Sequence, residues 1–233
     1  MRDDNAIAGV AHAGFECAPN CGLEDWATLA SAWHAWLERT IARCDGLDAP
    51  FCHSEHGCMH SFMAAAESVG WSTLREVAGN RGDASGGDGY LDGCLIGDHF
   101  LDLVEAKHHE FKVSADGTLP GGDFNRLAKL ARDSTTDAAA YFNRHPLFAP
   151  DRPFRLPRRR IGTLFATGWL AAEPADGDRS LEAYLAKLRT LPHDVMAWSF
   201  PQAVHGLRYW DRHYVGVVML ATLVKTEPAA AAG

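Results

Sequence analysis

One segment, DGYLDGCLIGDHFLDLVEAK at positions 88–107, constrains the fold of this chain more than any other. It contains two extended apolar runs around Gly97-Asp98, a pattern that predicts two antiparallel strands joined by a two-residue turn. The second run, 100–106, is almost continuously apolar, as is typical of a buried strand. It nevertheless contains Asp102 and ends in Glu105-Ala106-Lys107, and buried charges cost free energy unless a partner compensates them.

The charged residues of this segment are predicted to share one face of the hairpin. Side chains alternate along a strand, so Glu105 and Lys107 point to the same side. With Gly97-Asp98 as the turn, Asp92 faces Leu103 and is a diagonal neighbour of Glu105, about 7–8 Å away between backbones. Two carboxylates at this separation can bind one hard cation between them. A loop one residue longer would place Asp92 on the opposite face.

The pattern of Asp92 followed by Glu105-x-Lys107 on the next strand resembles the signature of the PD-(D/E)xK nucleases. Tyr90-Leu91-Asp92-Gly93 with Leu103-Val104-Glu105-Ala106-Lys107 is most similar to the restriction-endonuclease-fold toxins of bacterial polymorphic and type VI secretion systems. The proline of the signature is absent before Asp92. The resemblance implies an α/β fold, a restriction-endonuclease-like mixed β-sheet flanked by helices. An N-terminal helical portion (1–80) would pack on the nuclease-like core (81–233) in one compact domain.

The resemblance also implies a metal-dependent nuclease, an endonuclease that hydrolyses DNA as an antibacterial secreted effector. Asp92 and Glu105, with the carbonyl of Ala106, would hold Mg²⁺ or Mn²⁺. Lys107 would orient or deprotonate the attacking water, or stabilise the pentavalent phosphate. Burial would lower the pKa of Lys107 and the two carboxylates would raise it, and the sequence leaves open which effect is larger.

The family pattern places a further catalytic acid on a helix before the first core strand. Glu67, on a helix predicted at 60–69, is the first candidate for this acid, and Glu76, on a helix predicted at 72–78, is the second. The implied partners are DNA, with RNA as the other possible substrate, a cognate immunity protein, and secretion machinery or a chaperone. No membrane partner is implied.

The net charge of −8 argues against unspecific coating of nucleic acid, although bound cations and local patches still permit a nuclease. Positions 151–160 contain five arginines and one aspartate, a local charge of +4. This segment is the best candidate for phosphate contacts, the alternative being a solvated loop with arginine–acid pairs. The predicted nucleic-acid-binding residues are Arg152, Arg155, Arg158, Arg159 and Arg160.

The cysteine and histidine content suggests a different class of protein. Six cysteines in a protein made in the cytoplasm are expected to be thiols, or metal ligands, rather than disulfides. The cluster CHSEHGCMH (52–60) has a spacing that fits no familiar zinc finger, but its side chains are potential ligands of a structural zinc. These residues are Cys52, His53, His56, Cys58 and His60, with Cys17 and Cys21 upstream. Besides a zinc-stabilised structural protein, the alternative is a catalytically inactive nuclease-fold module of the immunity or adaptor type.

The chain has no run of eighteen apolar residues and no apolar core of a signal peptide near its start, so we expect cytoplasmic synthesis and no membrane span. Export into a target bacterial cytoplasm would then use a route without a cleaved signal peptide. Hydrophobic periodicity predicts further helices at 23–44, 123–143 and 180–191 and strands at 161–171, 195–200 and 214–224. Residues 1–21 are expected to be an irregular arm.

Overall fold

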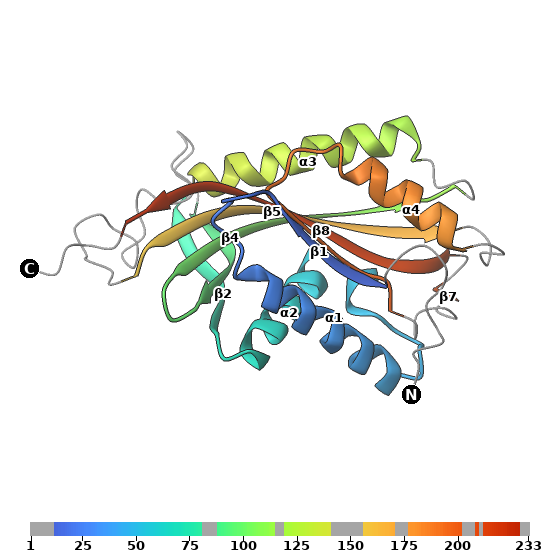
Figure 1. Cartoon of the computed structure of the whole chain (residues 1–233), viewed down its shortest axis with the longest axis horizontal. Helices are drawn as coiled ribbons and strands as arrows, with labels where there is room; N and C mark the ends of the chain where they lie inside the picture. Colours follow the sequence, from blue (N-terminus) through green and yellow to red (C-terminus); the bar gives the residue numbers. More distant parts are fainter. Residues whose placement is uncertain are drawn as a thin grey trace, which may run out of the picture.

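The protein is built around one mixed β-sheet with helices on both faces (Figure 1). The computed structural model describes residues 12–80, 88–114, 119–140, 156–170, 177–201, 208–209 and 212–228. The strands are β1 (Ala13–Cys17), β2 (Ser72–Asn80), β3 (Asp88–Ile96), β4 (Leu101–Lys112), β5 (Arg158–Leu170), β6 (Val195–Ser199), β7 (Arg208–Tyr209) and β8 (Arg212–Glu227). This architecture confirms the predicted α/β class and the mixed sheet flanked by helices.

The sheet has the strand order β1-β6-β8-β5-β4-β3-β2, and β7 pairs with β8. Among the described strands, β4 and β5 are the parallel pair, and the other pairs are antiparallel. Parallel neighbours need a long crossover, and helix α3 (Gly121–Ala140) lies between β4 and β5 in the sequence. Both sheet edges come from the N-terminal eighty residues, so this portion contributes strands β1 and β2 as well as helices.

Two helices cover each face of the sheet (Figure 1). Helices α1 (Trp26–Arg43) and α2 (Glu55–Ser68) pack on one face, and α3 and α4 (Gly177–Leu188) pack on the other. A short 3-10 helix, η1 (Pro50–Cys52), precedes α2. In the part of the chain that the structure describes, none of these helices has the length and apolar character needed to cross a membrane.

The tryptophan-rich helix α1 belongs to the core, as its 3–4 residue periodicity predicts. Trp26 and Trp33 are buried, and their rings pack against Phe62 of α2 with centroids 5.2 and 5.7 Å away. The indole N–H groups are also satisfied, because Trp26 Nε1 donates to Asp102 at 2.8 Å and Trp33 Nε1 donates to Ser61 at 2.9 Å. The Trp26 contact thus anchors α1 to the start of β4, and the other contacts join α1 to α2.

Two predictions about the N-terminal portion are wrong. Residues 72–78 were predicted to be helical but form most of edge strand β2, because pairing with β3 outweighs a weak helical pattern. The predicted irregular arm contains β1, which pairs with β6 from Ala13–Ser199 to Cys17–Val195. Helix α2 also begins five residues before its predicted start, at Glu55.

The hairpin between β3 and β4 has the predicted strands but a longer loop. Ile96 pairs with Leu101 rather than with His99, so residues 97–100 form the connection. Phe100 leaves the predicted strand because its ring packs against Trp71, with centroids 4.8 Å apart. A register shift of two residues keeps every side chain on its predicted face, whereas a shift of one would reverse it.

Candidate active site

The candidate site lies where β3 and β4 separate. Their described pairing ends at Gly93–Val104, while β4 continues beside β5 to Lys112. Extending the register by one residue sets Asp92 opposite Glu105, directly rather than diagonally. Beyond this point the N–H of Ala106 donates a hydrogen bond to Asp92 Oδ2 at 2.7 Å. The carboxylate thus serves as the acceptor that a backbone carbonyl of β3 would otherwise provide. We call this opening between the strands the fork.

A second acid, Glu55, reaches the fork from the first turn of α2. Ser54 caps that helix, since its Oγ accepts the N–H of Gly57 at 3.4 Å. Gly57 lies so close to η1 that a Cβ there would be 2.1 Å from the carbonyl oxygen of Pro50. The backbone N–H of His108 on β4 donates to the carboxyl group of Glu55. The cap and the glycine contact thus fix where Glu55 meets β4.

Glu105 and Lys107 complete the charged group at the fork. Glu105 is 2% exposed, and its Oε1 accepts a hydrogen bond from Lys107 Nζ at 2.6 Å. Lys107 Nζ also lies 3.1 Å from Asp137 Oδ2 on α3. Glu105 Oε2 is buried and has no hydrogen-bond partner within the described residues. A buried oxygen without a donor is rare in folded proteins, and a cation ligand is one way to satisfy it.

The electrostatics of the fork reflect crowded carboxyl groups. Burial, then the charge of Asp92, raises the pKa of Glu105 to about 7, although Lys107 opposes the rise. Burial also raises the pKa of Asp92, against the hydrogen bond from Ala106. For Glu55, burial and then Asp92 raise the pKa to about 6. Because these carboxyl groups repel one another when they are all ionised, a cation bound between them would stabilise the ionised forms.

The pKa of Lys107 answers the question that the sequence left open. Burial disfavours its ammonium form, but Glu105 and then Asp137 outweigh burial and raise the pKa of Lys107. Lys107 is therefore a charged donor in this arrangement rather than a neutral base.

The donor set fits a hard cation better than zinc. Glu55, Asp92 and Glu105 supply carboxylate oxygens from α2, β3 and β4. Among the described residues, the one group of three such side chains with ligand atoms all within 4.8 Å of one another is Cys17, Cys21 and Glu24. The oxygens of Glu55, Asp92 and Glu105 are therefore farther apart than that. Magnesium retains several waters and needs only one or two protein carboxylates, so it tolerates this wider spacing.

Neither predicted helical acid belongs to the buried group of charges at the fork. Glu67 lies near the opposite end of α2, about 18 Å along the axis from Glu55, and its carboxylate accepts a hydrogen bond from Thr73. Glu76 lies on β2 opposite Asp92 in the register, but its side chain is 67% exposed and pairs with His56 at 4.0 Å. Glu55 is the acid of α2 that reaches the fork. Ser54 directly before Glu55 was the available signal, because serine is a preferred N-cap.

The predicted phosphate-binding arginines divide into two groups. Arg152 and Arg155 lie outside the described residues. Arg158, Arg159 and Arg160 begin β5, and their side chains are 13%, 10% and 8% exposed. These three form ion pairs with acids of the same chain, and their contact with nucleic acid stays a prediction.

The cysteine and histidine cluster is not gathered into a zinc site among the described residues. His53 instead pairs with Asp48 at 2.6 Å. Burial raises the pKa values of the Cys52 and Cys58 thiols and so disfavours the thiolates that zinc requires. The expectation that all cysteines are thiols or metal ligands is wrong for one pair, because the loop after β1 brings two of them together. This pair is the disulfide Cys17–Cys21.

No protein-family model, no curated protein and no solved structure matches this chain. The functional argument therefore rests on the residues of the chain itself.

Proposed function

We propose that the protein is a metal-dependent nuclease of restriction-endonuclease-like fold that hydrolyses phosphodiester bonds, with DNA as the preferred substrate and RNA as the alternative. The observation that carries this proposal is the meeting of Glu55, Asp92 and Glu105 with Lys107 at the fork. Three buried or half-buried acids beside one lysine, which also pairs with Asp137, are costly for a purely structural ion pair, because at least two of the negative charges lack a partner cation.

The order of elements supports the same proposal. Helix α2 carries an acid and precedes the antiparallel strands β2, β3 and β4, which are followed by helix α3 and the parallel strand β5. This order agrees with the expectation that an acid-bearing helix precedes the core strands and that another helix follows the E-x-K strand.

The proposed chemistry assigns each residue a separate task. Glu55, Asp92 and Glu105 would hold Mg²⁺ or Mn²⁺, and the carbonyl of Ala106 remains the predicted fourth ligand. The bound ion supplies charge neutralisation at the scissile phosphate and lowers the pKa of an attacking water. The N–H of Ala106 orients Asp92 through their 2.7 Å hydrogen bond.

Lys107 acts as a fixed cation in this proposal. Glu105 and Asp137 hold its ammonium group from two sides, at 2.6 and 3.1 Å. A held ammonium can donate to a phosphoryl oxygen as negative charge develops in the transition state, without reorganisation during the reaction. The raised pKa of Lys107 favours this role over deprotonation of the water.

The biological setting that we propose is that of an antibacterial effector, on the basis of the Tyr90-Leu91-Asp92-Gly93 and E-x-K resemblance. Such an effector would be exported without a cleaved signal peptide and act in a target bacterial cytoplasm. Its producer would need a cognate immunity protein.

Plasmid digestion tests the proposed activity. Wild-type protein with millimolar Mg²⁺ should degrade the plasmid, and EDTA should stop the reaction. Lys107→Ala should abolish cleavage, whereas Lys129→Ala should retain it, because Lys129 is 68% exposed on α3 and pairs only with Asp133 among the described residues. Full activity in Lys107→Ala would exclude the assigned site, and absence of cleavage of both DNA and RNA by wild type would favour an inactive binding module.

A further inference from the structure

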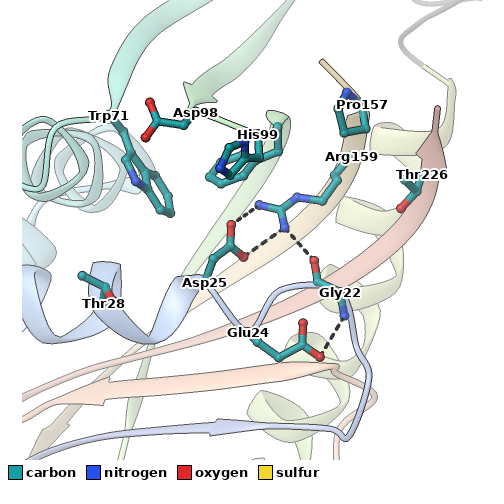
Figure 2. Close-up of a pocket in the computed structure, with 11 residues that line it drawn as sticks. Gly22, Glu24, Asp25, Thr28, Trp71, Asp98, His99, Pro157, Arg159 and Thr226 are labelled. Atoms are coloured by element: carbon teal, nitrogen blue, oxygen red, sulfur yellow. Dashed lines mark hydrogen bonds and ion pairs between the residues drawn. The ribbon is translucent and has the colours of Figure 1, made fainter. Parts of the chain in front are cut away.

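A second concave site lies beside the start of β4, on the face of the sheet that α1 covers. It is a cleft of about 610 Å³ between the start of α1, the loop before β2, the β3–β4 loop and the start of β5 (Figure 2). Asp102, beneath the cleft, is three residues from Glu105 on β4, and an odd separation places the two side chains on opposite faces. We call this site the acidic cleft, and its polar and aromatic lining includes Glu24, Asp25, Trp71, Asp98, Phe100 and Arg159.

Arg159 in this cleft has no donor left for an anionic ligand. Its Nε and Nη2 donate to the two oxygens of Asp102 at 2.5 and 2.8 Å. Nη1 and Nη2 also donate to the two oxygens of Asp25 at 2.9 and 2.8 Å, and Nη1 donates to the carbonyl of Gly22 at 2.6 Å. A guanidinium group has five N–H donors, so all of them are used within the protein. A phosphate or carboxylate would therefore have to displace an existing partner.

The acidic cleft has an excess of negative charge. Asp25 and Asp102 provide two carboxylates against the single guanidinium of Arg159. Glu24 and Asp98 add two exposed carboxylates, and within the described ranges no ion pair neutralises either of them. Figure 2 shows the carboxylate of Asp98 beside the ring of Trp71, across the opening from Asp25. A ligand in this position meets negative charge from two sides.

An aromatic wall accompanies these carboxylates. The ring of Phe100 already stacks on Arg159, with the guanidinium carbon 4.0 Å from the ring centroid. Trp71 contacts Phe100 edge-on at an interplanar angle of 79°, and its partly exposed indole lines the cleft (Figure 2). Indole faces attract cations, and tryptophan is the strongest of the aromatic side chains in this respect.

We propose that the acidic cleft binds a guanidinium or alkylammonium group, from a basic side chain of a partner polypeptide or from a free polyamine. Carboxylates at the rim attract the charge, and Trp71 supplies a surface for the flat or methylene part of the ligand. The volume lies within the range of about 300–1,000 Å³ found for small-ligand sites. The proposal does not depend on nuclease activity, because no residue of the fork lines the cleft.

Titration calorimetry with short peptides tests this site. The probe is acetyl-Gly-Arg-Gly-amide, and its control contains citrulline, which has nearly the same shape as arginine but no charge. Wild-type protein should bind the arginine peptide and not the citrulline peptide, with a dissociation constant of about 1 mM or tighter. The double substitution Glu24→Gln and Asp98→Asn should weaken binding by about tenfold or more.

The matched control is Asp45→Asn, which removes a negative charge from an exposed position outside the cleft and suits the positive φ of 52° at that residue. It should leave binding within about twofold of wild type. Equal binding of both peptides, or an equal loss in Asp45→Asn, would overturn the proposal, as would absence of binding at about 10 mM peptide. Spermidine binding that is tighter than the peptide and equally sensitive to the double substitution supports a free polyamine. The reverse order supports a basic side chain.

Discussion

Replacing Glu105 by glutamine is expected to stabilise the protein increasingly as pH rises, when no divalent metal is added. Burial and the charge of Asp92 raise the pKa of Glu105 from 4.5 to about 7. Between these two values the folded protein binds more protons at this site than the unfolded chain does. Ionisation of Glu105 therefore reduces stability as pH rises through this window, and the reduction levels off above the folded pKa. Glutamine has a similar shape and does not ionise.

The size of the effect follows from the two pKa values. Integrating the difference in bound protons from pH 5 to pH 8 gives a loss of about 2–3 kcal/mol from Glu105. His108 works in the opposite sense, since burial lowers its pKa to about 4 and favours the folded state as pH rises. The wild-type profile alone is therefore not diagnostic. Subtracting it from the Glu105→Gln profile removes the titrations that the two proteins share, and the remainder belongs to Glu105 and its neighbour Asp92.

Urea denaturation in EDTA at pH 5, 6, 7 and 8 measures this difference. The Glu105→Gln protein should gain about 2–3 kcal/mol relative to wild type across the series. The attraction of Lys107 for ionised Glu105 is already contained in the pKa of about 7, so it adds no separate contribution to this difference. Glu67→Gln, at an exposed position, is the control. A difference that is flat or falls with pH would refute the buried pairing of Glu105 with Asp92.

Three further perturbations test other parts of the molecule. Millimolar Mg²⁺ should raise the melting temperature of wild type, measured by scanning calorimetry, and raise that of Asp92→Asn less. A wild-type melting curve that Mg²⁺ leaves unchanged would count against a cation site. Arg159→Met leaves the fully buried Asp102 without its cation and should cost about 3–5 kcal/mol in urea denaturation, a loss under about 1 kcal/mol being incompatible with the described network. Gly57→Ala sets a methyl group against the Pro50 carbonyl, so it should lower both the melting temperature and Mg²⁺-dependent cleavage, and wild-type values for both would contradict the tight contact.

Local periodicity was sufficient to predict several elements of the fold. The stripe of apolar residues along α1, nearly all of β5 and the central run of β8 are buried, so pattern and structure agree. The shared face of Asp92 and Glu105 was also predictable, because the loop after β3 is two residues longer than expected and an even shift preserves the face.

Features set by tertiary packing were not predictable in the same way. Glu55 is distant from Asp92 in sequence and reaches it only because η1 and α2 dock at the end of the β3–β4 pairing. Its segment was interpreted as a metal-binding cluster, since histidine and cysteine dominate the composition there. Asp137 depends on the rotation of α3 about its axis, which a periodicity of buried residues fixes only approximately.

The most direct test of the central claim compares two glutamates of one helix in a cleavage assay. Glu55→Gln and Glu67→Gln make the same chemical change at opposite ends of α2, and only Glu55 is at the fork. With a fluorescent DNA duplex and saturating Mg²⁺, Glu55→Gln should reduce the cleavage rate by about 100-fold, while Glu67→Gln stays within about threefold of wild type. Equal rates for the two variants, or a larger loss in Glu67→Gln, would contradict the assignment of the active site.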